Sequence, residues 1–326
     1  MRHSLWPCRS EKAAGCGYQR LSGHSMTGVL VLDKPAGFTS FDAVAVLRRL
    51  TGERKIGHTG TLDPMATGVL PMLLGKATRA LPFLADRHKT YEAGFAFGTA
   101  TDTLDCTGKI LMQDAVPVTR EKLMALLPRF TGEVSQVPPM YSALRKDGVR
   151  LYDLARQGKT VERQARTVQI DSLELLGYDE QKRTGQLRLT CSGGTYVRTL
   201  CDDLGRAAGS CGIMTSLRRT AAAGFTLSDA IALEDARQME RKTLLKHVLP
   251  VEYLFQDLPE IVVTLPQAKR FSNGGGLALE RLHPIEHMTG NCRVKTPQGR
   301  FIGLGALNSE KGELEVARLF AQEDGT

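Results

Sequence analysis

One acidic residue stands in a turn built from small residues. The stretch "GTLDPMATG" (60–68) contains a single carboxylate, Asp63, between Gly60 and Gly68, and Pro64 follows it directly. Glycine permits backbone angles that other residues resist, and proline fixes the backbone after the acid. Such a turn would hold the carboxylate in one direction, as a nucleophile requires. Asp-Pro is also a common turn dipeptide, so the stretch by itself favours a structural turn.

A second charged residue could pair with this acid. Arg198 lies in "SGGTYVRTL", at the end of a strand that we expect over residues 185–200. Strand alternation would put Tyr196 and Arg198 on the same face, where Arg198 would be partly buried. A buried guanidinium needs a carboxylate partner, and Asp63 could supply it.

Two further polar side chains could line the same pocket. Tyr91 begins a strand-like run at 89–98, and its hydroxyl could move a proton or its ring could stack on a base. Lys34 follows the apolar run "GVLVLD" and would bring a cation to the end of that strand. Each residue is by itself more often structural than functional. Asp102 and Asp105 could be mistaken for a metal pair, but we interpret them as turn residues.

The segments that must position these residues mix helices and strands. We expect strands at 28–37, 67–75, 89–98, 167–179 and 185–200, and helices at 39–52 and 119–130. Thr39 and Asp42 form a capping-box pattern and Gly52 can end the first helix. The spacing is not that of regular βαβ units, so we expect an α+β sheet rather than a doubly wound one. A connecting segment at 240–258 precedes short strands that favour a small β-barrel.

Composition sets limits on the class of protein. The 326 residues carry a formal charge of +8, which fits a plain basic protein or one that binds nucleic acid. No apolar run reaches the roughly 18 residues of a membrane span, so we expect no membrane association. The seven cysteines form no CxxC pair, which is typical of reduced cytosolic thiols. Residues 1–25 lack an apolar segment of a secretory signal, and we expect a disordered tail there rather than a transit peptide.

Five motifs, in order along the chain, resemble the TruB family of tRNA pseudouridine synthases. They are "GVLVLDKPAGFTSFDAV", "GHTGTLDPMATGVLP", "KTYEA", "MYSALRKDGVRLYDLARQG" and "SGGTYVRTLCDDLG". The resemblance implies an α+β fold with a mixed, mainly antiparallel sheet, an RNA-clasping insertion and a PUA-like β-barrel domain. The parts would be a disordered extension at 1–26, the catalytic domain at 27–245 and the PUA-like RNA-binding domain at 246–326.

The resemblance also implies a reaction and roles for the residues. The family isomerises the uridine at position 55 in the tRNA T-loop, detaching uracil and reattaching it through a carbon, without a metal or other cofactor. Asp63 would be the nucleophile, on the ribose or on the uracil ring, after the base has been flipped out of the RNA. Arg198 would keep Asp63 ionised and aimed, and Tyr91 would stack on the base and could move a proton.

The remaining site residues follow from the same resemblance. His58 would stack where the base had been, although a lone histidine is more often structural. Leu217 would lie beside the base, and Lys34 and Tyr196 would form the pocket wall. The basic insertion at 141–166 would contact the RNA backbone, unless it is only a solvated helix. Its cations expected at the RNA are Arg145, Lys146, Arg150, Arg156 and Lys159.

These expectations describe a cytoplasmic, monomeric enzyme that acts on the T-arm of tRNA without an obligate protein partner. The alternative is a tRNA-folding chaperone in which modification is secondary, because the basic insertion would serve both roles. A cofactor-dependent methyltransferase would need a glycine loop after the first strand, and "DKPAGFTS" does not offer one. Replacement of Asp63 separates the first two hypotheses.

Overall fold

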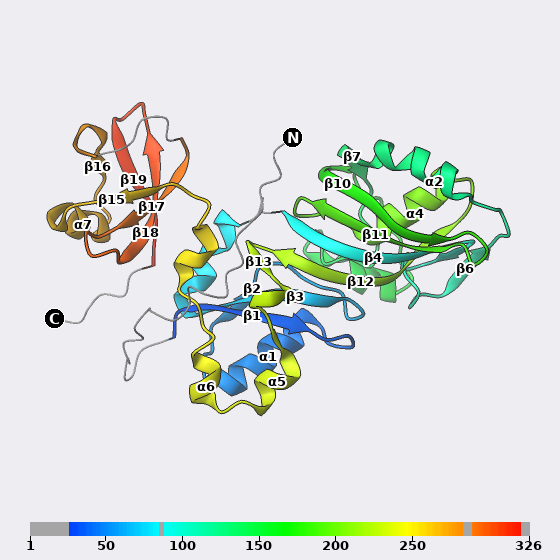
Figure 1. Ribbon diagram of the computed structural model, residues 1–326, viewed down its shortest axis with the longest axis horizontal. Coiled ribbons are helices and arrows are strands. Elements are labelled where there is room, and N and C mark those ends of the chain that lie inside the picture. The colour runs from blue at the N-terminus through cyan, green and yellow to red at the C-terminus, as the bar shows by residue number, and fades with distance from the viewer. Residues whose placement is uncertain (1–25, 85–87, 283–288, 321–326) are drawn as a thin grey trace.

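The computed structural model describes residues 26–84, 88–282 and 289–320, so the tail expected at 1–25 lies outside the described residues. A ten-stranded mixed sheet forms the larger part, and a five-stranded sheet near the C-terminus forms the smaller part (Figure 1). The architecture is α+β, as the sequence predicted, and the smaller sheet is of the curled, PUA-like kind.

The large sheet brings distant segments side by side. Its strand order is β14 (Ile231–Ala232), β1 (Gly28–Lys34), β3 (Thr67–Leu74), β12 (Gly212–Ala222), β4 (Lys89–Phe97), β11 (Thr184–Cys191), β10 (Arg166–Asp179) and β7 (Gly132–Gln136). In addition, β2 (Ile56–His58) pairs with β3, and β13 (Phe225–Thr226) pairs with β12. Two of these pairings, β1 with β14 and β12 with β3, are parallel, and the others are antiparallel. Because β12 lies between β3 and β4, the turn before β3 comes close to side chains of all three strands.

The first helix begins and ends where the sequence predicted. In α1 (Ser40–Thr51), the Thr39 side chain accepts from the Asp42 amide and Asp42 caps the Thr39 backbone in return. Gly52 ends the helix with φ of 72°, a left-handed conformation that favours glycine. Two short helices, α5 (Leu233–Gln238) and α6 (Arg241–Leu245), contact α1 below β1 in Figure 1.

The strand expected at 185–200 is wrong in its second half. β11 ends at Cys191, and α4 (Val197–Ala207) begins after Tyr196. Gly194 has φ of 84° and turns the chain between the two elements. Arg198 therefore lies in the first turn of a helix and not on the face of a strand.

Smaller elements complete the large part. They are β5 (Thr99–Thr101), β6 (Ile110–Gln113), α2 (Arg120–Leu126), β8 (Arg145–Lys146), β9 (Val149–Arg150), α3 (Leu151–Arg156) and the 3-10 segments Gly75–Phe83, Leu127–Phe130, Leu227–Asp229 and Val251–Phe255. The strands β5 and β6 form one hairpin, and β8 and β9 form another.

The small sheet packs against the large part through apolar side chains. Its strand order is β15 (Glu260–Val262), β17 (Asn291–Lys295), β18 (Phe301–Asn308), β19 (Glu313–Leu319) and β16 (Leu277–Ala278), with α7 (Leu265–Ser272) and the 3-10 segment Leu279–Arg281 beside it. Leu304 and Phe320 share a buried cluster with Phe255 and with Val29 of β1. The two sheets are therefore joined by a common core as well as by the connecting segment.

Candidate active site

The turn that carries Asp63 joins β2 to β3 and is tied down on both sides of the acid. The Ser40 hydroxyl accepts from the Leu62 amide at 2.8 Å, and the Gly37 amide donates to the Pro64 carbonyl at 2.8 Å. The Asp63 side chain remains 34% exposed. A fixed backbone and an accessible carboxylate are what a nucleophile needs.

Arg198 pairs with Asp63, as the sequence predicted. Nε of Arg198 lies 3.1 Å from Oδ2 of Asp63, and Nη2 lies 3.4 Å from Oδ1. The same guanidinium donates to the carbonyls of Tyr141 at 2.9 Å and Thr103 at 3.2 Å. Because the Arg198 side chain is only 7% exposed, these partners replace the water it would otherwise bind.

A second carboxylate faces the same arginine. Oδ2 of Asp105 lies 3.5 Å from Nη1 of Arg198. Asp105 also makes the turn contacts expected from its sequence, because its Oδ1 accepts from Thr103 at 2.8 Å and from the Thr107 hydroxyl at 2.6 Å. Its proximity to Arg198 was missed, and no local sequence signal indicates it. The described residues hold no group of three or more His, Cys, Asp or Glu that could bind a metal.

Opposing effects act on the pKa of Asp63, and the net result is a raised pKa. Burial raises the pKa of its carboxyl above the ordinary value, and the nearby Asp105 acts in the same direction. Arg198 and Lys34 oppose the rise, because both cations favour the carboxylate. The carboxyl thus gives up its proton less readily than an exposed aspartate.

Lys34 contacts the backbone of the Asp63 turn. It is the last residue of β1 and is fully buried, and its Nζ donates to the carbonyls of Phe38 at 2.6 Å, Pro35 at 2.9 Å and Pro64 at 3.4 Å. Burial lowers its pKa to about 8, although Asp63 acts against this. The ammonium faces backbone carbonyls under the turn, next to the residue that follows Asp63.

Tyr91 and Leu217 lie on the neighbouring strands β4 and β12. Their exposed fractions are 7% and 8%, so both are essentially buried. Tyr91 is opposite Arg219 in the register of β12 with β4, and Leu217 is opposite Ala93. Burial raises the pKa of Tyr91, which keeps the phenol protonated, while the positive charge of Arg219 works in the other direction.

His58 and Tyr196 border the same region. His58 is the last residue of β2, and burial lowers its pKa, so the imidazole is neutral at physiological pH. Its Nδ1 is buried and has no hydrogen-bond partner among the described residues. Tyr196 precedes α4, and its backbone exchanges two hydrogen bonds with the Gln136 side chain, at 3.0 and 3.2 Å.

The basic insertion forms a separate, exposed surface. The five cations expected at the RNA backbone are all exposed and lie on or near the β8–β9 hairpin and α3: Arg145, Lys146, Arg150, Arg156 and Lys159. The guanidinium carbons of Arg150 and Arg156 lie 5.6 and 5.4 Å from the centre of the Tyr152 ring. Since the carbonyl of Tyr141, where this insertion begins, accepts from Arg198, the basic surface is connected directly to the site.

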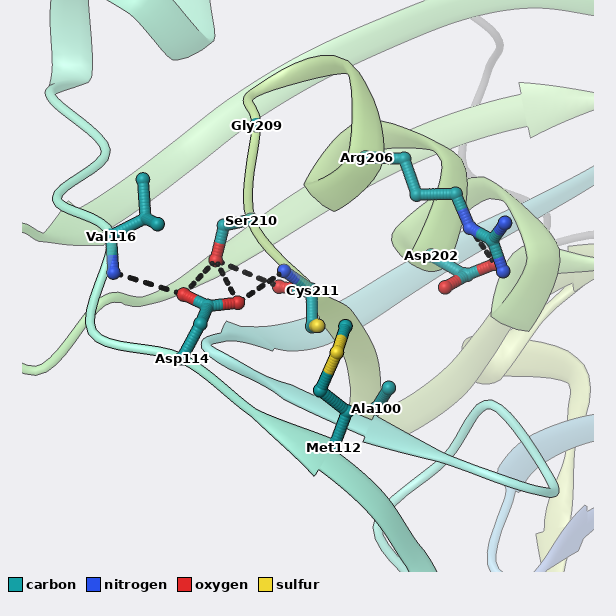
Figure 2. A pocket seen from close by; sticks show the side chains of 9 residues that line it. All are labelled: Ala100, Met112, Asp114, Val116, Asp202, Arg206, Gly209, Ser210 and Cys211. Carbon is teal, nitrogen blue, oxygen red and sulfur yellow. Dashed lines mark hydrogen bonds and ion pairs between the residues drawn. The ribbon is translucent and has the colours of Figure 1, made fainter.

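A cavity of about 390 Å³ lies elsewhere, beside the end of α4 (Figure 2). Asp114 accepts there from the Ser210 hydroxyl at 2.8 Å and the Cys211 amide at 2.8 Å. Although burial works in the other direction, these hydrogen bonds lower the pKa of Asp114 to about 2. None of the predicted site residues lines this cavity. The carboxylate ties the β5–β6 hairpin to the chain after α4, which is a structural task.

Two family models match consecutive parts of the chain. Residues 48–197 match the TruB family pseudouridylate synthase (N terminal domain), and residues 198–256 match the tRNA pseudouridylate synthase B C-terminal domain. The boundary between the models falls at Arg198, inside the site. The five-stranded sheet lies beyond both models.

Individual proteins are similar over most of the chain. A tRNA pseudouridine synthase B from Ralstonia pickettii is 46% identical over 261 residues, which cover 79% of this chain and 81% of that protein. One from Pseudomonas putida is 42% identical over 303 residues, covering 92% and 97%. Among solved structures, a chain of a Cbf5-Nop10-Gar1 complex is 26% identical with a TM-score of 0.71, covering 91% of this chain and 86% of that one.

Proposed function

Since the chain belongs to the TruB family of pseudouridine synthases, we propose that Asp63 is the nucleophile with which it isomerises uridine to pseudouridine in tRNA. The observation that carries this proposal is the pairing of Asp63 with Arg198 at 3.1 Å on a turn fixed from both sides. A carboxylate that is held in one direction, paired with a buried cation and still 34% exposed is suited to attack.

The chemistry requires that uracil leaves its stack and reaches this carboxylate. Asp63 adds to the ribose or to the uracil ring, the N1–C1′ bond breaks, and a C5–C1′ bond forms. The proton on C5 is then lost, N1 gains a proton, and Asp63 is released. Tyr91 is the candidate for moving a proton, because it is protonated and lies on β4 opposite Arg219, whose side chain donates to the Asp63 turn.

The remaining residues would hold the RNA. His58 is neutral and suited to stacking in the space that the flipped base leaves, while Leu217 and Tyr196 would contact the base. The exposed cations of residues 141–166 would bind phosphates, and the small sheet, within the part from 246 to 326, would bind another part of the tRNA. The substrate would be the T-arm, with uridine 55 as the target.

The chain would act in the cytoplasm as a monomer. In the described part of the chain, no helix has the length and apolar character needed to span a membrane. The chemistry proposed for Asp63 uses side chains alone and needs no metal or other cofactor.

The test is release of tritium from a tRNA transcript labelled at C5 of uridine, with EDTA present and no cofactor added. Wild-type protein should release tritium and Asp63→Asn should not, although it still binds tRNA. Mapping of the product should find pseudouridine at position 55. Binding without release by the wild type would contradict the proposal and would instead support a tRNA-folding role.

A further inference from the structure

Arg219 is the largest fully buried side chain described, with an exposed fraction of 0%. It lies on β12, between β3 and β4, and no carboxylate of the described residues forms an ion pair with it. A buried charge without a counter-charge is costly, and the cost would be avoided by an apolar side chain of similar volume. We therefore expect the arginine at this position to have a role that an apolar residue could not fulfil.

The guanidinium joins the two ends of the Asp63 turn. Nη2 donates to the carbonyl of Gly60, before the acid, at 3.1 Å, and Nε donates to the carbonyl of Val69, after the acid, at 2.7 Å. The planar guanidinium sets the spacing of its donors rigidly, so these two bonds fix the distance between the two ends.

The backbone of the same residue packs tightly on the turn. Gly68 has φ of 106°, and a Cβ at this position would collide with the backbone of Arg219. The parallel pairing of β12 with β3 places Arg219 directly opposite Gly68. Main chain and side chain of Arg219 thus contact the turn at three residues, Gly60, Gly68 and Val69.

One nitrogen of the guanidinium makes no hydrogen bond to the turn. Nη1 is buried and has no hydrogen-bond partner among the described residues. The groups that its charge affects are Tyr91, Lys34, His58 and Lys89, and none of them is a carboxylate. A net positive charge is therefore kept between the turn and Tyr91, in addition to the charge of Arg198.

We propose that Arg219 is a positioning residue, which holds the backbone at both ends of the Asp63 turn, while Arg198 holds the Asp63 carboxylate. The proposal rests on the proposed function of Asp63. The two arginines have separate tasks: Arg198 orients the side chain of the nucleophile, and Arg219 sets the backbone from which that side chain extends. Misplacement of a nucleophile by about 1 Å can cost on the order of 100-fold in rate.

The test compares Arg219→Gln and Arg219→Lys with wild type on a C5-tritiated tRNA transcript, with rates normalised to the folded fraction. Arg219→Gln should lower kcat about 100-fold while KM changes less than about threefold, because the loss concerns orientation and not binding. Arg219→Lys keeps the charge and can reach one carbonyl, so it should recover about tenfold of that loss. Arg188→Gln is the matched control: Arg188 lies on β11 and pairs with Glu92 at 2.9 Å, not with the Asp63 turn, and the kcat of this variant should stay within about threefold of wild type.

Three outcomes would overturn the positioning role: a normal kcat per folded molecule in Arg219→Gln, a rise in KM alone, or an equal kcat loss in the Arg188 control. If Arg219→Gln does not fold, Arg219→Lys decides, and a wild-type kcat in that variant contradicts the proposal. Wild type and Asp63→Asn are measured beside them. Failure of the wild type to release tritium would contradict the proposed function, whereas normal release by wild type and by the Arg219 variants contradicts only the role of Arg219.

Discussion

The carboxylate of Asp63 and the guanidinium of Arg198 are 3.1 Å apart, although 135 residues separate them in the chain. The pair joins the turn before β3 to the first turn of α4, and the strands from β3 to β11 lie between these two places in the chain order. Arg198 also binds Asp105 and two carbonyls, so it collects three segments around the nucleophile. One buried cation thus connects these segments to the nucleophile.

Asp63→Asn should abolish isomerisation and leave the fold intact. Asparagine keeps the size of the side chain and can still accept a hydrogen bond from Arg198, but it is not a nucleophile. Tritium release should fall below detection, while the affinity for tRNA measured by filter binding stays within about threefold. Asp102→Asn, in the neighbouring turn, serves as the control and should remain active. Near-normal release by Asp63→Asn would exclude the assigned role.

Arg198→Ala should lose both stability and activity. Its removal leaves Asp63 partly buried and Asp105 fully buried without their cation, which costs about 3 kcal/mol, the low end for a broken buried pair because Asp63 is partly exposed. Denaturant unfolding measures this loss, and Arg198→Lys, which keeps the charge but not the forked geometry, should recover part of it. An unchanged unfolding midpoint in Arg198→Ala would mean that the pair contributes nothing to the fold.

The activity should have an acid limb that Asp63 controls. The nucleophile must be ionised, and burial raises its pKa above that of an exposed aspartate, which is about 3.9. As pH is lowered, the rate should therefore begin to fall at a higher pH than it would with an exposed aspartate. Stability responds to pH in the opposite direction from activity. A carboxyl whose folded-state pKa is raised destabilises the fold at neutral pH, and this destabilisation decreases as pH falls. Acid inactivation by this group should therefore occur in folded protein. Single-turnover rates and circular dichroism over the same pH range check this, and coincident loss of rate and structure would contradict it.

Local signals in the sequence predicted much of the framework. The capping box and Gly52 delimit α1, and the apolar runs of β1, β3 and β4 end within one to three residues of the expected positions. The Asp63–Arg198 pair was also predicted, because a buried arginine requires an acid. The backbone conformation at Arg198 was not predicted. The sequence indicates a strand that continues to residue 200, whereas the strand ends at Cys191 and Arg198 lies in a helix.

Asp105 and Arg219 could not be found in the same way. Each becomes meaningful only through strand pairing over a long sequence distance, which places β12 between β3 and β4 and brings the β5 turn to α4. Arg219 in "LRRT" resembles any surface arginine in sequence, and only its position opposite Gly68 and Tyr91 makes it a buried residue.

The insertion should control RNA affinity separately from the chemistry. Tyr152 lies between Arg150 and Arg156, which keeps two guanidinium groups close together on one surface. Replacing both with glutamine should weaken tRNA binding and reduce the slope of log affinity against log salt by about two, roughly one for each phosphate that is no longer neutralised. The rate at saturating tRNA should stay near wild type, because neither side chain contacts Asp63 or Arg198. Lys182→Gln, an exposed cation in the β10–β11 connection, is the control with an unchanged slope. A fall in the saturated rate without any change in slope would assign this surface to positioning of the base and not to phosphate binding.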